Sequence, residues 1–152
     1  MHPGFVVYNT GTMLRLRAEC GSAIGTNFDP SHLFWQGIDP AQSIRALKGA
    51  IFHMHAKDTT LDRVNIAVNG VLDTGSYRNL DQRSWYFRTI GHGQPEMVWK
   101  DIMRALRIAG YDYVMSIEHE DALASVDEGV AKAASFLKGV LFDEPPADPW
   151  WV

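Results

Sequence analysis

Apolar positions along the chain follow two different periods, and segments of the two kinds alternate. A short apolar run stands at residues 4–8. Strand-like apolar patterns cover residues 23–29, 51–57 and 113–119, and apolar positions three and four apart, typical of helices, cover residues 10–20, 40–50, 95–109 and 125–140. Strands separated by helices of this length predict right-handed β/α units around a parallel sheet.

The ends of the expected helices carry residues that start and stop helices. Gly21 and Gly110 stand where the first and third helices should end, because glycine readily adopts the backbone conformation that terminates a helix. Asp39 and Pro40 supply an N-cap and a first-turn proline for the second helix. A capping box at residues 125–128 opens the last one.

The connection between residues 58 and 94 breaks this rhythm, because it shows no strong helical period. A structureless stretch of this length inside a compact domain is either functional or evidence of a misassigned element. It directly follows the strand that carries His55. We therefore expect residues 59–93 to form a less regular lid or substrate loop over the same end of the sheet.

Each expected strand has two faces, because side chains alternate along a strand. In all three strands the small and polar side chains share one face, which becomes more polar toward the C-terminal end. Its polar members are Asn27, Asp29, His53, His55, Lys57, Ser116, Glu118 and Glu120. The opposite faces are apolar, as expected where strands pack against helices. This arrangement predicts a barrel interior that opens onto a site at its top.

Three of these side chains end three separate strands and form a candidate divalent-metal site: Asp29, His55 and Glu118. In parallel β/α barrels, the loops that follow the strands carry the chemistry. Two carboxylates with one imidazole suit manganese, magnesium, cobalt or zinc, and the residue types do not choose among these ions.

Each of the three residues also has a purely structural explanation. Asp29 could serve only in a helix-capping turn, His55 could be a core histidine bonded to a main-chain carbonyl, and Glu118 could be a surface ion-pair partner. We favour the metal site because the three positions support one another. His53 lies deeper in the expected barrel and is expected to be structural.

Composition narrows the classes of function. The 152 residues are 46% hydrophobic and 21% charged, which is ordinary for one globular domain. The formal net charge of -4 argues against a nucleic-acid partner, which needs a basic face. Cys20 is the only cysteine, no run is long and apolar enough to span a bilayer, and no signal-peptide pattern is visible. We expect a cytoplasmic protein without a membrane partner.

Basic residues, glycines and tryptophans in less regular segments leave interpretations open. Several arginines between residues 58 and 94 either bind a small anionic ligand or belong to a solvated loop. The turn at residues 91–93, Gly-His-Gly, is weakly suggestive of a phosphate-cradling turn. In the Pro-rich tail, Trp150 and Trp151 are expected to pack on the barrel wall or on a partner, with a disordered end as the alternative.

Around the candidate metal ligands, the chain resembles the sugar phosphate isomerase/epimerase family of the xylose isomerase-like barrel superfamily. The matching stretches are HPGFVVYNTGT, NFDPSHLFWQGIDP, HMHAKDT, RTIGHGQPEMVWKDIM and GYDYVMSIEHED. The resemblance implies an eight-stranded β/α barrel with a divalent metal at its C-terminal mouth. This chain corresponds to the C-terminal half of such a barrel, with the partial domain at residues 1–142 and a tail at residues 143–152.

The same resemblance assigns roles to individual residues. Asp29, His55 and Glu118 would ligate the metal, and Glu118 would also be one of two acid/base carboxylates. His32 would contact substrate oxygens. Lys57, Arg88 and His92 would lie at the rim of the substrate site. The implied reaction is metal-dependent proton transfer on a sugar or sugar derivative through an enediolate.

The resemblance is incomplete at the N-terminal end. Family members carry a further glutamate ligand, the second acid/base group, just before the dipeptide that corresponds to His2-Pro3, and here only Met1 precedes it. We therefore expect impaired activity, and pairing with a missing N-terminal half or a homo-oligomer. Two alternatives remain: a non-catalytic half-barrel fragment, whose open strand edges would recruit partners, and a metal-dependent phosphodiesterase like the DNA-repair endonucleases of related fold.

Overall fold

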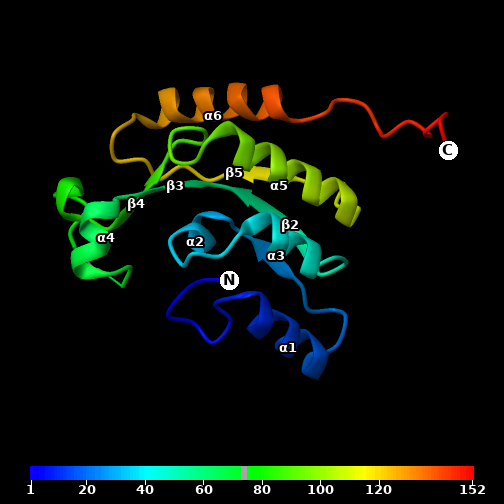
Figure 1. The fold of residues 1–152 in the computed structure, drawn as a ribbon, viewed down its shortest axis with the longest axis horizontal. Helices are drawn as coiled ribbons and strands as arrows, with labels where there is room; N and C mark the ends of the chain where they lie inside the picture. Colours follow the sequence, from blue (N-terminus) through cyan, green and yellow to red (C-terminus); the bar gives the residue numbers. More distant parts are fainter. Residues whose placement is uncertain (73–74) are drawn as a thin grey trace.

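A computed structural model describes residues 1–72 and 75–152, and the expected lid residues 73 and 74 lie outside the described residues. Figure 1 shows the arrangement of the elements. The helices are α1 (Thr10–Cys20), α2 (Ser31–Phe34), α3 (Pro40–Ala46), α4 (Arg63–Asn69), α5 (Glu96–Ala109) and α6 (Val126–Val140), with a short 3-10 helix η1 (Leu80–Gln82). The strands are β1 (Thr26–Phe28), β2 (Ile51–Ala56), β3 (Asp58–Leu61), β4 (Trp85–Arg88) and β5 (Met115–Ile117).

The central sheet is parallel and has the strand order β1-β2-β5. Phe28 of β1 lies opposite Met54 of β2, and His55 of β2 lies opposite Ser116 of β5. Helices separate these strands along the chain, so the expected α/β fold with parallel strands is confirmed. Among the described residues, no further strand pairs with the outer edge of β1 or of β5.

The connection after β2 is more regular than expected. A single residue, Lys57, separates β2 from β3, and β3 pairs antiparallel with β4, from Asp58 opposite Arg88 to Leu61 opposite Trp85. The antiparallel pair of β3 and β4, which we call the hairpin, therefore lies with α4 beyond the C-terminal end of β2, where the lid was expected (Figure 1). The two strands were not predicted, because each short strand is stabilised by a partner more than twenty residues away rather than by a local pattern.

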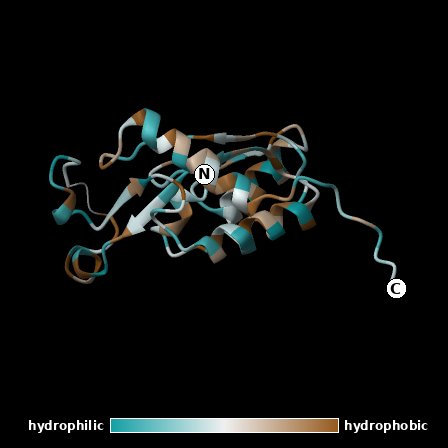
Figure 2. Cartoon of the chain, turned by 90° about the horizontal axis from the view of Figure 1, so that it is seen from above, coloured by the Kyte–Doolittle hydropathy of each residue, from teal (hydrophilic) through white to brown (hydrophobic). Residues whose placement is uncertain are grey.

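The apolar face of the parallel sheet packs against α3 and α5. Phe28, Met54 and Ala56 are fully buried, together with Ile44 of α3 and Ile102 of α5. Figure 2 shows hydrophobic and hydrophilic residues alternating around the helices, as expected when one side of a helix faces a core. Burying each large apolar side chain contributes about 1.5–3 kcal/mol. This packing holds the opposite, polar face of the sheet away from the helices.

Phe52 departs from the strand alternation. The pairing of β1 with β2 shifts register between Thr26 and Asn27, which is the signature of a β-bulge. Phe52 is 48% exposed, although Met54 two residues later is fully buried. Its ring covers Gly25, where an added Cβ would come within 2.5 Å of the ring. A side chain at position 25 would therefore have to displace the Phe52 ring.

The helix ends follow the sequence signals. Gly21 and Gly110 follow the last residues of α1 and α5 with positive φ, and the Asp39 side chain accepts hydrogen bonds from the start of α3. The Ser125 side chain accepts from the amide of Glu128, which is one half of the expected capping box.

Both ends of the chain lie outside the helices and strands. Residues 3–6 form a turn and a bend, in which the Phe5 amide donates to the His2 carbonyl at 3.1 Å. Trp150 and Trp151 are exposed, and the tail extends away from the helices (Figure 1). The expected packing of these tryptophans on the barrel wall was wrong, because the nearby prolines favour an extended chain over a returning one.

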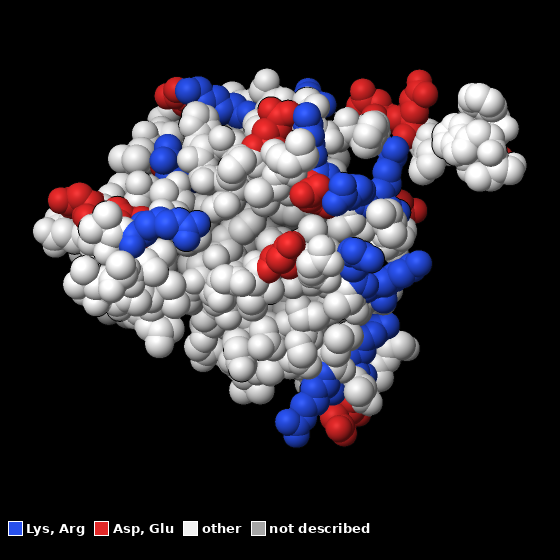
Figure 3. Space-filling view, in the orientation of Figure 1, with Lys and Arg blue, Asp and Glu red and all other residues white. Residues whose placement is uncertain are grey.

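The surface and the helices agree with the composition. Within the described part of the chain, every helix is too short or too polar to cross a membrane. Figure 3 shows acidic and basic side chains interspersed on one face of the molecule, in keeping with the small formal net charge of -4.

The turn at residues 91–93 encloses an anion that belongs to the protein itself. The Asp58 carboxylate is fully buried and accepts hydrogen bonds from the amides of Gly91, Gly93 and Gln94, at 2.9–3.1 Å. The indole of Trp99 donates to the same carboxylate at 3.3 Å. These glycine-turn amides are therefore engaged by Asp58, which corrects the idea that they cradle a phosphate.

Replacing Asp58 by alanine should lower the free energy of unfolding by at least about 3 kcal/mol, because buried amides lose their acceptor at about 1–3 kcal/mol each. Asp58→Asn keeps one carbonyl oxygen and should lose less. Urea unfolding followed by circular dichroism gives both values. Asp112→Ala changes an exposed aspartate and should stay within about 0.5 kcal/mol of wild type. Equal losses in Asp58→Ala and this control would contradict the anchoring role.

Candidate metal centre at the strand ends

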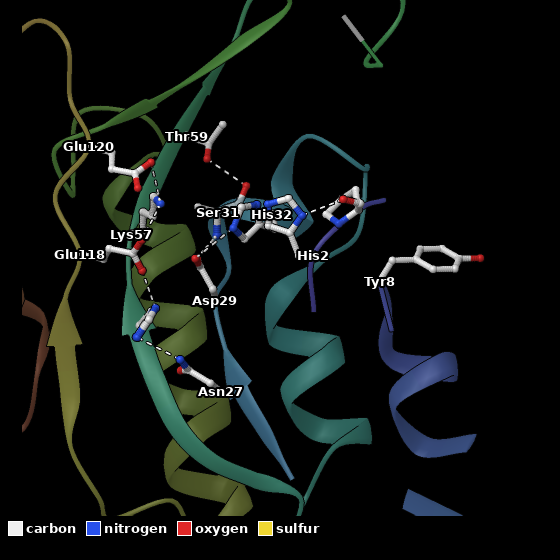
Figure 4. A network of polar contacts seen from close by, with 12 residues as sticks. His2, Tyr8, Asn27, Asp29, Ser31, His32, Lys57, Thr59, Glu118 and Glu120 are labelled. Carbon is white, nitrogen blue, oxygen red and sulfur yellow. Dashed lines mark hydrogen bonds and ion pairs between the residues drawn. The ribbon is translucent and has the colours of Figure 1, made fainter. Parts of the chain in front are cut away.

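Three donor side chains converge at one end of the parallel sheet. Asp29 follows β1, His55 lies near the end of β2, and Glu118 follows β5. Their ligand atoms all lie within 4.8 Å of one another. Figure 4 shows Asp29 and Glu118 pointing toward the same space from different strands. The structure thus brings together the three residues that strand alternation had singled out.

Asp29 is buried and takes part in a turn as well as in the cluster. One of its oxygens, Oδ1, accepts from the amide of Ser31 at 2.9 Å, and the other, Oδ2, lies 3.5 Å from Nε2 of His32. Burial raises the pKa of Asp29, although the hydrogen bonds from Ser31 work in the opposite direction. Asp29 therefore accepts a hydrogen bond at the start of α2 and also contributes a ligand atom to the cluster, so its two interpretations are compatible.

His55 contacts a neighbour through each ring nitrogen. Its Nδ1 lies 2.5 Å from Oε2 of Glu118, and its Nε2 lies 3.0 Å from the side-chain amide of Asn27. Asn27 shares the polar face of its strand with Asp29, so alternation could have identified it as a partner. His53 lies deeper, with Nε2 at 2.8 Å from the Ser116 hydroxyl. This contact agrees with the structural role expected for His53.

Lys57 places a buried positive charge beside the cluster. Its ammonium lies 2.9 Å from Oε1 of Glu118 and 3.0 Å from Oε2 of Glu120, and its side chain is 3% exposed. Burial disfavours the ammonium, but the hydrogen bonds to these two carboxylates raise the pKa of Lys57. Burial also acts to raise the pKa of Glu118, and the hydrogen bond and charge of Lys57 outweigh it and lower that pKa.

His32 is held as a neutral imidazole. Its ring centroid lies 4.2 Å from that of His2 and 5.6 Å from that of Phe87. Burial is the main reason that the pKa of His32 falls to about 3. Its Nδ1 is buried, and among the described residues it has no hydrogen-bond partner. His32 lines the cavity that leads to the donors, where a neutral ring can take part in hydrogen bonds without adding charge.

An aromatic side chain from the hairpin closes one side of the cluster. Phe87 of β4 lies edge-on to His32, and its ring centroid is 4.0 Å from the Lys57 ammonium. Trp85, two residues earlier on the same face, stacks on Trp35 at 4.5 Å. Phe87 was not among the residues predicted for the site, because only the alternation of residues 85–88 as a strand could have indicated the face it occupies.

Arg88 and His92 are not part of this cluster in the structure. Arg88 alternates with Phe87 along β4 and directs its guanidinium to Asp121, 3.1 Å away. His92 is exposed, and its amide donates to the Thr89 carbonyl. The structure therefore groups His32 and Lys57 with the donors, whereas Arg88 and His92 have other surroundings.

An open cavity of about 630 Å³ gives access to the donors. Asp29, His32, His55 and Glu118 line one part of it, and apolar residues of the N-terminal segment, such as Phe5, line another. A small polar molecule could therefore reach the donor atoms directly.

The chain matches known proteins over most of its length. A family model described as xylose isomerase-like TIM barrel matches residues 1–140. A curated relative is the uncharacterized protein YfiH of Bacillus subtilis (strain 168), which is 38% identical over 133 residues, 88% of this chain and 42% of the relative.

A solved structure shows the same fold. The crystal structure of a xylose isomerase domain protein from Planctomyces limnophilus matches with a TM-score of 0.64 and 23% identity, over 87% of this chain and 43% of that one. The chain thus spans about two fifths of the length of each of these proteins.

His32 should make the protein less stable in acid. Its pKa is about 3 in the folded protein against an ordinary value of 6.5, so the unfolded chain binds more protons between these values. The stability linked to neutral His32 is present above about pH 6.5 and is lost as pH falls toward 3, by up to about 1.4 kcal/mol per pH unit. His32→Gln should flatten the curve of unfolding free energy against pH in this window.

Urea unfolding at a series of pH values measures this slope, with His92→Gln as the control at an exposed histidine. Wild type and His92→Gln should share one slope. If the curve of His32→Gln ran parallel to theirs, burial of a neutral His32 would not be the cause of the acid sensitivity.

Proposed function

The chain belongs to the xylose isomerase-like TIM barrel family, and on this premise we propose that its cluster supports metal-dependent proton transfer on a sugar or sugar derivative, as in isomerases and epimerases. The observation that carries the proposal is the convergence of Asp29, His55 and Glu118 within 4.8 Å at the ends of parallel strands. Barrel enzymes keep their catalytic groups at this end.

The donor set fits a divalent ion. Two carboxylates and one imidazole are hard-to-borderline ligands, which suit manganese, magnesium, cobalt or zinc. Such an ion would supply Lewis acidity to neighbouring carbonyl and hydroxyl oxygens of a sugar. Asp29, His55 and Glu118 would hold it.

The remaining residues define what the protein does around this centre. In the proposed reaction Glu118 is one of two acid/base carboxylates: one takes the proton from the carbon beside a carbonyl, which leaves an enediolate, and the other returns a proton on the same face or on the opposite face, giving isomerisation or epimerisation. Neutral His32 exchanges a hydrogen bond with a substrate hydroxyl group. Phe87 closes the side of the site next to Lys57 and limits the access of water from the hairpin.

We also propose that further β/α elements complete the barrel at the free edges of β1 and β5. Two observations support this: the outer edges of these strands are unpaired among the described residues, and the matched relatives are more than twice as long as this chain. An edge strand presents main-chain donors and acceptors that favour pairing with another strand. The proposed activity would then belong to the completed barrel.

Calorimetric titration of the purified chain with Mn²⁺ tests the metal centre. One ion per chain should bind, and Asp29→Asn, His55→Gln and Glu118→Gln should each weaken binding by at least about tenfold, because each removes one donor. Exchange of the proton beside the carbonyl, followed by NMR with a panel of ketoses in heavy water, tests the chemistry. Glu118→Gln should slow any such exchange by about a hundredfold.

Asp112→Asn and Glu128→Gln make the same chemical changes at exposed positions and should bind Mn²⁺ like wild type. Wild-type protein that bound no divalent ion, or donor variants that bound as well as these controls, would refute the metal centre.

A further inference from the structure

We propose that Lys57 is a fixed cation built into the metal centre, which weakens divalent-ion binding and neutralises the carboxylates when no ion is bound. The inference rests on the proposed function, because it concerns the affinity of the same centre. It assigns to Lys57 control of metal affinity, rather than the contact with substrate expected from the resemblance.

The first support is the sharing of Glu118 between two partners. Its Oε1 lies 2.9 Å from the Lys57 ammonium, whereas its Oε2 lies 2.5 Å from His55, on the side of the other donors. An ion bound by Glu118 would therefore share that carboxylate with a positive charge already in contact with it. Like charges on one carboxylate repel each other, most strongly where water is excluded.

The second support is that the Lys57 ammonium is buried and held in place. The Lys57 side chain is 3% exposed, its ammonium lies 4.0 Å from the ring centroid of Phe87, and a carboxylate oxygen of Glu120 lies 3.0 Å from it. A lysine on the surface would swing away from an incoming cation. This one is confined between an aromatic ring and two carboxylates, so its charge stays beside the centre.

The third support is the balance of charge. The Lys57 ammonium contacts the carboxylates of Glu118 and Glu120, and a third carboxylate, that of Asp29, lies within 4.8 Å of Glu118 in the donor cluster. Without a cation these carboxylates would repel one another in a partly buried site. Lys57 offsets this repulsion in the metal-free protein, and the same charge opposes the arriving ion.

The test is Mn²⁺ titration of Lys57→Met, which keeps much of the side-chain volume and removes the charge. Mn²⁺ prefers oxygen and nitrogen ligands, so the introduced thioether should add no affinity. We expect binding to tighten by at least about tenfold. We also expect a lower Tm without metal and a larger rise of Tm on adding Mn²⁺ than in wild type.

Lys100→Met is the matched control, because Lys100 is exposed on α5 and pairs with Glu96 away from the centre. It should bind Mn²⁺ like wild type. Weaker binding in Lys57→Met would overturn the inference and show that the lysine serves only to orient Glu118. Failure of wild type to bind any ion would instead refute the proposed metal centre itself.

Glu120→Gln provides a second measurement if Lys57→Met does not fold. Glu120 is not a donor of the cluster and is mostly exposed, so this change should preserve the fold. Removing its charge leaves Lys57 less compensated and should weaken Mn²⁺ binding by about threefold or more. Unchanged affinity in Glu120→Gln would also overturn the inference.

Discussion

The buried carboxylate of Asp58 joins the parallel sheet, the hairpin and α5, and the position of the site depends on this junction. It accepts hydrogen bonds from main-chain amides of the turn that follows β4 and from the indole N–H of Trp99 in α5. A buried carboxylate with this many donors fixes the relative positions of the segments that bond to it. Moving any one segment would leave a buried polar group without a hydrogen-bond partner. Lys57 precedes Asp58, so the same junction sets where the lysine emerges beside the cluster.

The positions of the charged residues around the cluster are set mainly by the strands that carry them. Asp29, His55 and Glu118 come from three neighbouring strands whose apolar faces are packed against helices, so their positions are fixed before any ligand arrives. Short polar contacts then link Glu118 to both His55 and Lys57. A cluster of this kind is preorganised, so the proposed binding of a cation would depend on the sum of the nearby charges rather than on rearrangement.

Much of this arrangement could be predicted from the sequence. The period of two in the strands places Asp29, His55 and Glu118 on one face, and glycines and capping residues mark the helix ends. The hairpin could not be predicted, because β3 and β4 are stabilised by pairing across more than twenty intervening residues. Nor could the surroundings of Arg88 be predicted, because its direction depends on the register of that pairing. The bulge that exposes Phe52 is likewise a tertiary feature.

The closed base of the hairpin has a consequence for how this protein can change in evolution. The pairing of Leu61 with Trp85 is the last pair of the β3–β4 ladder. Insertions or deletions between these two residues should therefore change the connecting segment and leave the register of the two strands intact. Between His55 and Asp58 the opposite holds. Losing or gaining one residue there would turn Lys57 or Asp58 to the wrong face of the strand. Length variation among homologues should therefore accumulate in residues 62–84 and be absent from residues 55–58.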